Sequence, residues 1–232
     1  KFEGFSKKGI RFLSDLKKHN DRDWFRERKQ VYDSEVRDSM VARVTEAASL
    51  CRQRGFAIYC KENNPVRRVY RDIRFSPDKR PFKTHVGASL YQRASASSPG
   101  EIYIHISPVE SFLAAGYWMP ERPFLHVWRQ QMVAAPKAFE SVVKALKRHG
   151  LEFLDQYSLK KLPRGYPAQA GTAIEPHLKL TSYVTSRKLA LDDVLSPSLV
   201  EAVARFAMDA RPLLEFGWAL HYSPRKDILD EA

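Results

Sequence analysis

Cysteine is scarce in this sequence and long apolar stretches are missing, and both absences narrow the class of protein. Cys51 and Cys60 are the 2 cysteines among 232 residues, too few for a disulfide scaffold. Neither belongs to a CxxC pair or to a Cys/His cluster with metal-ligand spacing. No stretch approaches the roughly 20 apolar residues of a membrane span. We therefore expect reduced thiols, a cytoplasmic protein and no membrane partner.

The short motifs of the common enzyme classes are also missing. The chain has no GxxxxGK[ST] phosphate loop, no GxGxxG turn, no GxSxG elbow and no HExxH helix. These absences remove support for the enzymes that carry such motifs. They leave open whether the protein is an enzyme, and the sequence names no cofactor and no oligomeric state.

Positive charge, in contrast, is abundant. The chain has 39 Lys and Arg against 27 Asp and Glu, a formal net charge of +12. A charge of this size favours anionic partners, either an anionic small molecule or nucleic acid. The excess is concentrated in residues 65–93, where two acidic residues, Asp72 and Asp78, stand against a larger set of basic ones. These are Arg67, Arg68, Arg71, Arg74, Lys79, Arg80, Lys83 and Arg93.

Helical spacing of apolar residues dominates the first quarter of the chain. Ser6 is placed to cap a helix over 7–18, and Asp21 to cap a second helical region that ends near Gly55. The N-terminal part is therefore predicted to be a helical pair.

Short alternating segments follow and predict strands. The expected strands cover 56–59, 66–70, 84–93, 101–107 and 111–117, and a small polar loop at 94–100 joins the third to the fourth. Such short connections are typical of an antiparallel meander.

The last part of the chain is predicted to return to helix. Helices are expected over 121–134 and 137–149, then a strand near 182–186 and a final helix that Ser196 and Pro197 would start. The sequence thus predicts an α+β fold, an antiparallel meander sheet with the N-terminal helical pair and the C-terminal helices packed on it. No linker or repeat interrupts the chain, so we expect a single domain over 1–232.

The cationic segment is the candidate functional site. Arginine forks suit carboxylates and phosphates, and lysine supplies a compact charge. We expect Asp72 to orient an arginine beside a bound anion. The candidate ligand contacts are Arg68, Arg71, Arg74, Lys79, Lys83 and, from the turn at 163–166, Arg164. His85 and His105 lie on the same face of neighbouring predicted strands and are candidate acid/base residues.

The same segment carries a family resemblance. Residues 68–75 read Arg-Val-Tyr-Arg-Asp-Ile-Arg-Phe, and an Asp78-Lys79 pair and the aromatic Phe82 follow. This pattern resembles an uncharacterised bacterial family, domain-of-unknown-function family 2461. Asn20–Phe25 and Leu162–Pro167 are also similar to it, and the resemblance covers nearly the full length. It implies no known activity.

Three hypotheses therefore stand side by side. The first is a site for a phosphorylated or otherwise anionic small ligand. The second is a nucleic-acid surface in which Tyr70, Phe75 or Tyr91 stacks on bases. The third is an interaction or scaffold domain whose arginines form structural pairs with Asp72 and Asp78. A concave pocket would favour the first, an open basic stripe the second, and closed Arg–Asp pairs the third.

Overall fold

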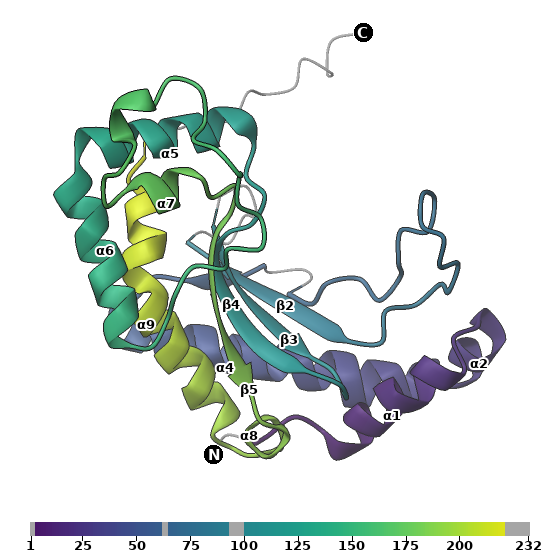
Figure 1. The fold of residues 1–232 in the computed structure, drawn as a ribbon. Coiled ribbons are helices and arrows are strands. Elements are labelled where there is room, and N and C mark those ends of the chain that lie inside the picture. Colours follow the sequence, from purple (N-terminus) through teal and green to yellow (C-terminus); the bar gives the residue numbers. More distant parts are fainter. Residues whose placement is uncertain (1–2, 62–64, 93–99, 221–232) are drawn as a thin grey trace, which may run out of the picture.

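A five-stranded antiparallel sheet organises the computed structural model, which describes residues 3–61, 65–92 and 100–220 (Figure 1). The strands follow one another across the sheet in chain order. They are β1 (Tyr59–Cys60), β2 (Val86–Tyr91), β3 (Glu101–Ile106), β4 (Ser111–Tyr117) and β5 (Tyr183–Leu189). The predicted α+β fold and antiparallel meander are confirmed, while residues 94–99 of the predicted loop lie outside the described residues.

Helices surround this sheet on one side. They are α1 (Lys7–Lys18), α2 (Arg22–Glu27), α3 (Lys29–Val31), a π-helix (Tyr32–Asp38), α4 (Ser39–Gln53), α5 (Arg122–Ala134), α6 (Pro136–Arg148), a 3₁₀ turn (Pro167–Gln169), α7 (Glu175–Leu178), α8 (Leu191–Leu195) and α9 (Leu199–Trp218). Helices α4 and α9 pack against each other and against the sheet, and α6 packs on α9 (Figure 1). None of the described helices is long and apolar enough to cross a membrane.

The sheet has one covered face and one open face. In β3 the isoleucines 102, 104 and 106 are buried toward the helices, while Tyr103 and His105 point the other way and are half-buried. This alternation follows from the two-residue period of a strand. The open face consequently presents side chains to solvent, and the candidate sites lie along it and at its edge.

The predicted N-terminal helices are confirmed, with one unexpected break. Ser6 caps α1 by accepting a hydrogen bond from the Gly9 N–H at 3.2 Å, and Asp21 caps α2 in the same way. The second helical region is interrupted by the π-helix. A Cβ added at Gly9 would lie 2.4 Å from the carbonyl oxygen of Glu35, so α1 approaches the π-helix backbone closely where a glycine leaves room.

Three of the predicted boundaries are wrong. Strand β1 begins at Tyr59 instead of ending there, and the predicted strand over 66–70 is an irregular segment with isolated bridges. Val66 and Val69 are both buried, three residues apart, which is incompatible with strict strand alternation. Ser198, not Ser196, precedes the first residue of α9, because Ser196 is the C-cap of α8.

Candidate functional site

Residues 70–82 form a projecting hairpin-like loop, which we call the arm. A bridge between Tyr70 and Phe82 closes its base, and the Arg71 N–H donates to the Pro81 carbonyl at 2.9 Å. On the right of Figure 1 the arm extends from the start of β2, above α2. Most of the predicted ligand residues therefore lie on a protrusion, outside the sheet itself.

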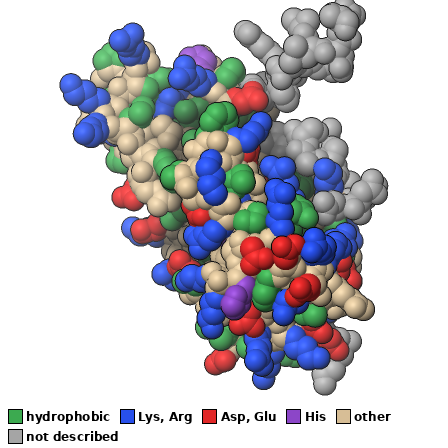
Figure 2. All heavy atoms as spheres, turned by 90° about the vertical axis from the view of Figure 1, so that its right-hand side faces the viewer, with side chains coloured by type: hydrophobic (Ala, Val, Ile, Leu, Met, Phe, Trp, Pro, Cys, Tyr) green, Lys and Arg blue, Asp and Glu red, His purple; other side chains and the backbone are tan. Residues whose placement is uncertain are grey.

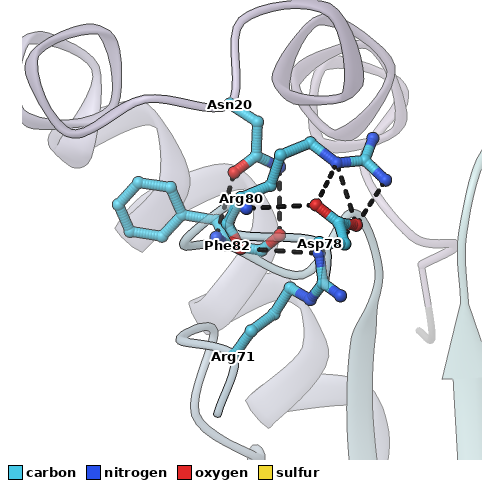
Figure 3. Close-up of polar contacts among 5 residues, drawn as sticks. All are labelled: Asn20, Arg71, Asp78, Arg80 and Phe82. Carbon is cyan, nitrogen blue, oxygen red and sulfur yellow. Dashed lines mark hydrogen bonds and ion pairs between the residues drawn. The ribbon is translucent and has the colours of Figure 1, made fainter. Parts of the chain in front are cut away.

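The arm is fastened to the turn between α1 and α2 by one asparagine. The Asn20 side chain accepts a hydrogen bond from the Phe82 N–H and donates one to the Phe82 carbonyl, both at 3.0 Å (Figure 3). The Phe82 ring is buried and stacks on Phe25, with centroids 4.1 Å apart. Asn20 thus acts on Phe82 as a neighbouring strand would, and it sets the distance between the arm and α2.

Ion pairs hold the outer part of the arm. The Asp78 carboxylate accepts from the Arg80 side chain at 2.7 Å and also from Arg71 (Figure 3). These bonds, with Arg80 the larger influence, hold the pKa of Asp78 far below its usual range. Asp72 pairs with Arg74 at 2.7 Å, and its pKa is lowered by that bond. Local Arg–Asp pairs therefore hold the outer part of the arm.

A groove with a strongly basic lining separates the arm from the N-terminal helices. Two adjoining cavities of about 510 Å³ and 200 Å³ share Phe25, Lys29 and Tyr70 as lining residues. We call this space the basic groove. Its cationic lining residues are Arg22, Arg26, Lys29, Arg37, Arg67, Arg68 and Arg71. Within the described lining, Asp33 is the one acidic residue.

The cations of the basic groove differ in how they are engaged. Arg22 and Arg68 are exposed and make no ion pair with any described residue. Lys29 pairs with Asp33 and Arg26 with Asp23, but these pairs are on the surface. Since exposed ion pairs contribute only about 0–1 kcal/mol, an incoming anion displaces them at little cost.

Lys83 lies at the base of the arm, close to two other cations. Its ammonium donates to the Arg68 carbonyl at 3.0 Å. Burial lowers its pKa, and the neighbouring positive charges of Arg67 and Arg68 lower it further. Positive charges held this close are typical of a site that receives an anion.

A second cavity, of about 410 Å³, lies on the open face of the sheet, and we call it the sheet pocket. Small side chains of β4 and β5 form its floor, namely Ala114, Gly116, Val184 and Ser186. Tyr103 of β3 and Phe112 of β4 also line it, together with Trp118, Leu154 and Gln156. Its four charged lining residues are Arg67, Glu101, Glu110 and Lys188.

Gly116 keeps the floor of the sheet pocket flat. Its φ of +129° is a conformation that residues with a side chain rarely adopt. A Cβ there would lie 2.0 Å from the carbonyl oxygen of Tyr183 on the paired strand. The absence of a side chain is thus a requirement of the β4–β5 pairing.

Beside the sheet pocket, the rings of His85 and His105 lie in contact, with centroids 4.2 Å apart and planes tilted by 32°. His105 also stacks on Phe112 at 4.6 Å, and its Nδ1 lies 3.2 Å from the Tyr103 hydroxyl. Burial lowers the pKa of each histidine to about 4; Lys83 and Arg67 add to the effect at His85, and His85 adds to it at His105. Both imidazoles are therefore neutral at pH 7.

Most of the chain matches a single protein family. Residues 8–216 match the sequence profile of a family described as conserved hypothetical protein (DUF2461). The chain belongs to this family. No curated protein and no solved structure gives a significant match to this chain.

In this DUF2461 protein the predicted ligand residues fall into separate groups. Arg68 and Arg71 line the basic groove, Lys83 lies beside it, and Asp72, Arg74 and Lys79 belong to the arm tip. Arg164 is exposed in a turn between α6 and α7 and lines neither cavity. That connecting segment lies at the upper left of Figure 1, whereas the arm lies at the right.

Several residues that line the two cavities were not predicted from the sequence. Arg22, Lys29 and Arg37 belong to helices far from the motif in sequence, and helical charge alone indicates only a solvated face. The floor of the sheet pocket consists of residue types that occur everywhere. Among the described residues, no group of three His, Cys, Asp or Glu side chains is placed to hold a metal ion.

Proposed function

We propose that this DUF2461 protein binds a multiply charged anion, a phosphorylated small molecule in the first instance, in the basic groove. The observation that carries the proposal is the lining of the groove, where seven cationic residues face one acidic residue. A concave space with one sign of charge concentrates oppositely charged ligands.

The origin of these cations supports a binding role. Arg22, Arg26 and Lys29 come from α2 and α3, whereas Arg68 and Arg71 come from the segment before and within the arm. Arg22 and Arg68, one from each of these parts of the sequence, make no ion pair with any described residue. Arginine forks on both walls suit phosphate oxygens, which accept several charge-assisted hydrogen bonds at once.

Exposed aromatic side chains favour a second candidate, single-stranded nucleic acid. Tyr70 lines the groove and is 53% exposed, and Phe75 at the arm tip is 95% exposed. Figure 2 turns this side of the molecule to the viewer and shows Lys and Arg side chains over much of it, with acidic ones among them. Bases stack on such rings without regard to sequence.

A charge-reversal pair tests the small-anion proposal. Arg22→Glu combined with Arg68→Glu should weaken binding of pyrophosphate, measured by isothermal titration calorimetry, by about ten-fold or more, because each arginine offers charge-assisted bonds. The control is Lys144→Glu with Lys147→Glu, which makes the same charge change at exposed positions of α6. Equal losses in both variants, or no binding to the wild type, would overturn the proposal.

The two candidate ligands are then separated by salt. A fluorescein-labelled single-stranded 12-mer bound through five phosphates should give a slope of log K against log salt near −3.5, that is, about −0.7 per phosphate. Tyr70→Ala should weaken the oligonucleotide and spare pyrophosphate if bases stack on this ring. Binding of pyrophosphate without binding of the oligonucleotide at low salt would remove the nucleic-acid candidate.

A further inference from the structure

The sheet pocket differs in chemistry from the basic groove and calls for a ligand of its own. Its volume of about 410 Å³ lies within the range of about 300–1,000 Å³ typical of small-molecule sites. We propose that the sheet pocket binds a neutral, planar heteroaromatic molecule. This proposal does not depend on anion binding in the groove.

The charges at the pocket argue for an uncharged ligand. Arg67 pairs with Glu101, and Lys188 pairs with Glu110 at 2.9 Å. Arg67 is further held by two bonds to the Ser89 hydroxyl, at 3.1 and 3.2 Å. The four charges thus cancel in pairs within the lining, so the pocket carries no net charge that would attract a charged ligand.

The shape and the aromatic lining argue for a flat ring. The floor at Ala114, Gly116 and Val184 rises little above the sheet, which leaves a shelf beside the aromatic rings. Tyr103 already carries the Arg67 guanidinium over its face, 4.6 Å from the ring centroid, and Phe112 stacks with His105. Rings that stack with one another also offer edges and faces to a planar ligand, at about 0.5–1.5 kcal/mol per aromatic contact.

Polar groups at the pocket argue for heteroatoms in that ring. The Gln156 amide and the Ser186 hydroxyl make no hydrogen bond to any described residue. An amide offers donors and an acceptor, and a hydroxyl offers both roles. Ring nitrogens and exocyclic carbonyl or amino groups match these partners, whereas a pure hydrocarbon would leave them unpaired.

The test uses two uncharged planar probes, riboflavin and adenosine, with equilibrium dialysis as the readout. Ala114→Leu places a larger side chain on the shelf and should weaken both probes by about ten-fold or more. Ala114 lies on the open face, so the change leaves the buried core intact. Ala138→Leu, the same substitution at an exposed position of α6, should bind like the wild type.

Two further measurements make the outcome specific. Arg22→Glu with Arg68→Glu should leave riboflavin affinity unchanged even if it abolishes pyrophosphate binding, which separates this proposal from the proposed function. Trp118→Ala should weaken riboflavin, because Trp118 lines the pocket and is half-exposed. Failure of both probes to bind the wild type at millimolar concentration overturns the inference, as does undiminished binding to Ala114→Leu.

Discussion

The basic groove and the sheet pocket are built in different ways. The pocket rests on the backbone ladder of β3, β4 and β5, and its floor follows from the pairing of Gly116 with Val184. The groove exists because a few side chains, chiefly Asn20 and Phe25, hold the arm against the N-terminal helices. Backbone pairing gives the pocket a rigid floor of small, uncharged side chains. The groove is lined by charged side chains, and its shape depends on single residues.

The largest expected effect comes from breaking the pocket floor. Gly116→Ala should lower the free energy of unfolding by more than about 3 kcal/mol, because the new Cβ is strained by the positive φ and collides with the Tyr183 carbonyl. Gly55→Ala is the matched control. Gly55 also has a positive φ, of +76°, but its Cβ would meet open space, so only the conformational cost of about 1–2 kcal/mol applies. Equal losses in urea unfolding would contradict the steric argument.

An intermediate effect should follow from releasing the arm. Asn20→Ala removes both hydrogen bonds to Phe82 and should cost about 2 kcal/mol of unfolding free energy. It should also weaken pyrophosphate in the groove while leaving riboflavin in the sheet pocket unaffected. Asn20→Asp keeps an acceptor for the Phe82 N–H but places an oxygen against the Phe82 carbonyl oxygen, so it should not restore the lost stability. A variant that weakened both ligands alike would show that the two cavities are not independent.

How visible the two regions are in the sequence also differs. The helices at 7–18 and 121–134 and the strand at 111–117 follow from caps and apolar periodicity, and the structure has them within a residue or two. The cationic residues that the segment before and within the arm gives to the groove are visible in the sequence as an excess of arginine. The sheet pocket has no such mark, because Ala114, Gly116 and Val184 become a floor only once three strands are paired.

The irregular parts were hidden for a related reason. The segment at 66–70 has the β-branched and aromatic residues of a strand, but it makes only isolated bridges, to Ala88 and Phe82. The π-helix at Tyr32–Asp38 has an ordinary helical composition, and its backbone approaches Gly9 of α1 closely. Tertiary contacts of this kind leave no local pattern to read.

The smallest expected effect is on the pH dependence of the unfolding free energy, and it arises from His105 beside the sheet pocket. Because the native pKa of His105 is about 4 and an unfolded histidine has about 6.5, the unfolded chain binds more protons between these values. Stability due to this group is therefore full above pH 6.5 and is lost as the pH falls toward 4. His105→Phe keeps a ring against Phe112 and should reduce the loss of unfolding free energy between pH 7 and 5 by about 1 kcal/mol, after allowance for solvent screening.

The control for the pH measurement is His126→Phe, at an exposed position of α5. It should leave the pH dependence of urea unfolding as in the wild type. The pairs of Asp78 in the arm should add no pH dependence to the unfolding free energy over this range. The pKa of that carboxyl is below pH 5 in the unfolded chain and is lower still in the native state. His85, whose pKa is also lowered to about 4, keeps its own part of the slope in His105→Phe. A slope as steep as that of the wild type would contradict the prediction for His105.

Arg67 borders both cavities, since it lines the sheet pocket and the basic groove alike. An anion in the groove that attracts this guanidinium would draw it from Glu101 and leave that carboxylate unpaired at the edge of the pocket. The occupancy of one cavity would then alter the affinity of the other by a fixed factor. Thermodynamic linkage requires the factor to be the same in both directions. A neutral ring in the pocket would therefore change the affinity for phosphate by the same factor by which phosphate changes the affinity for the ring.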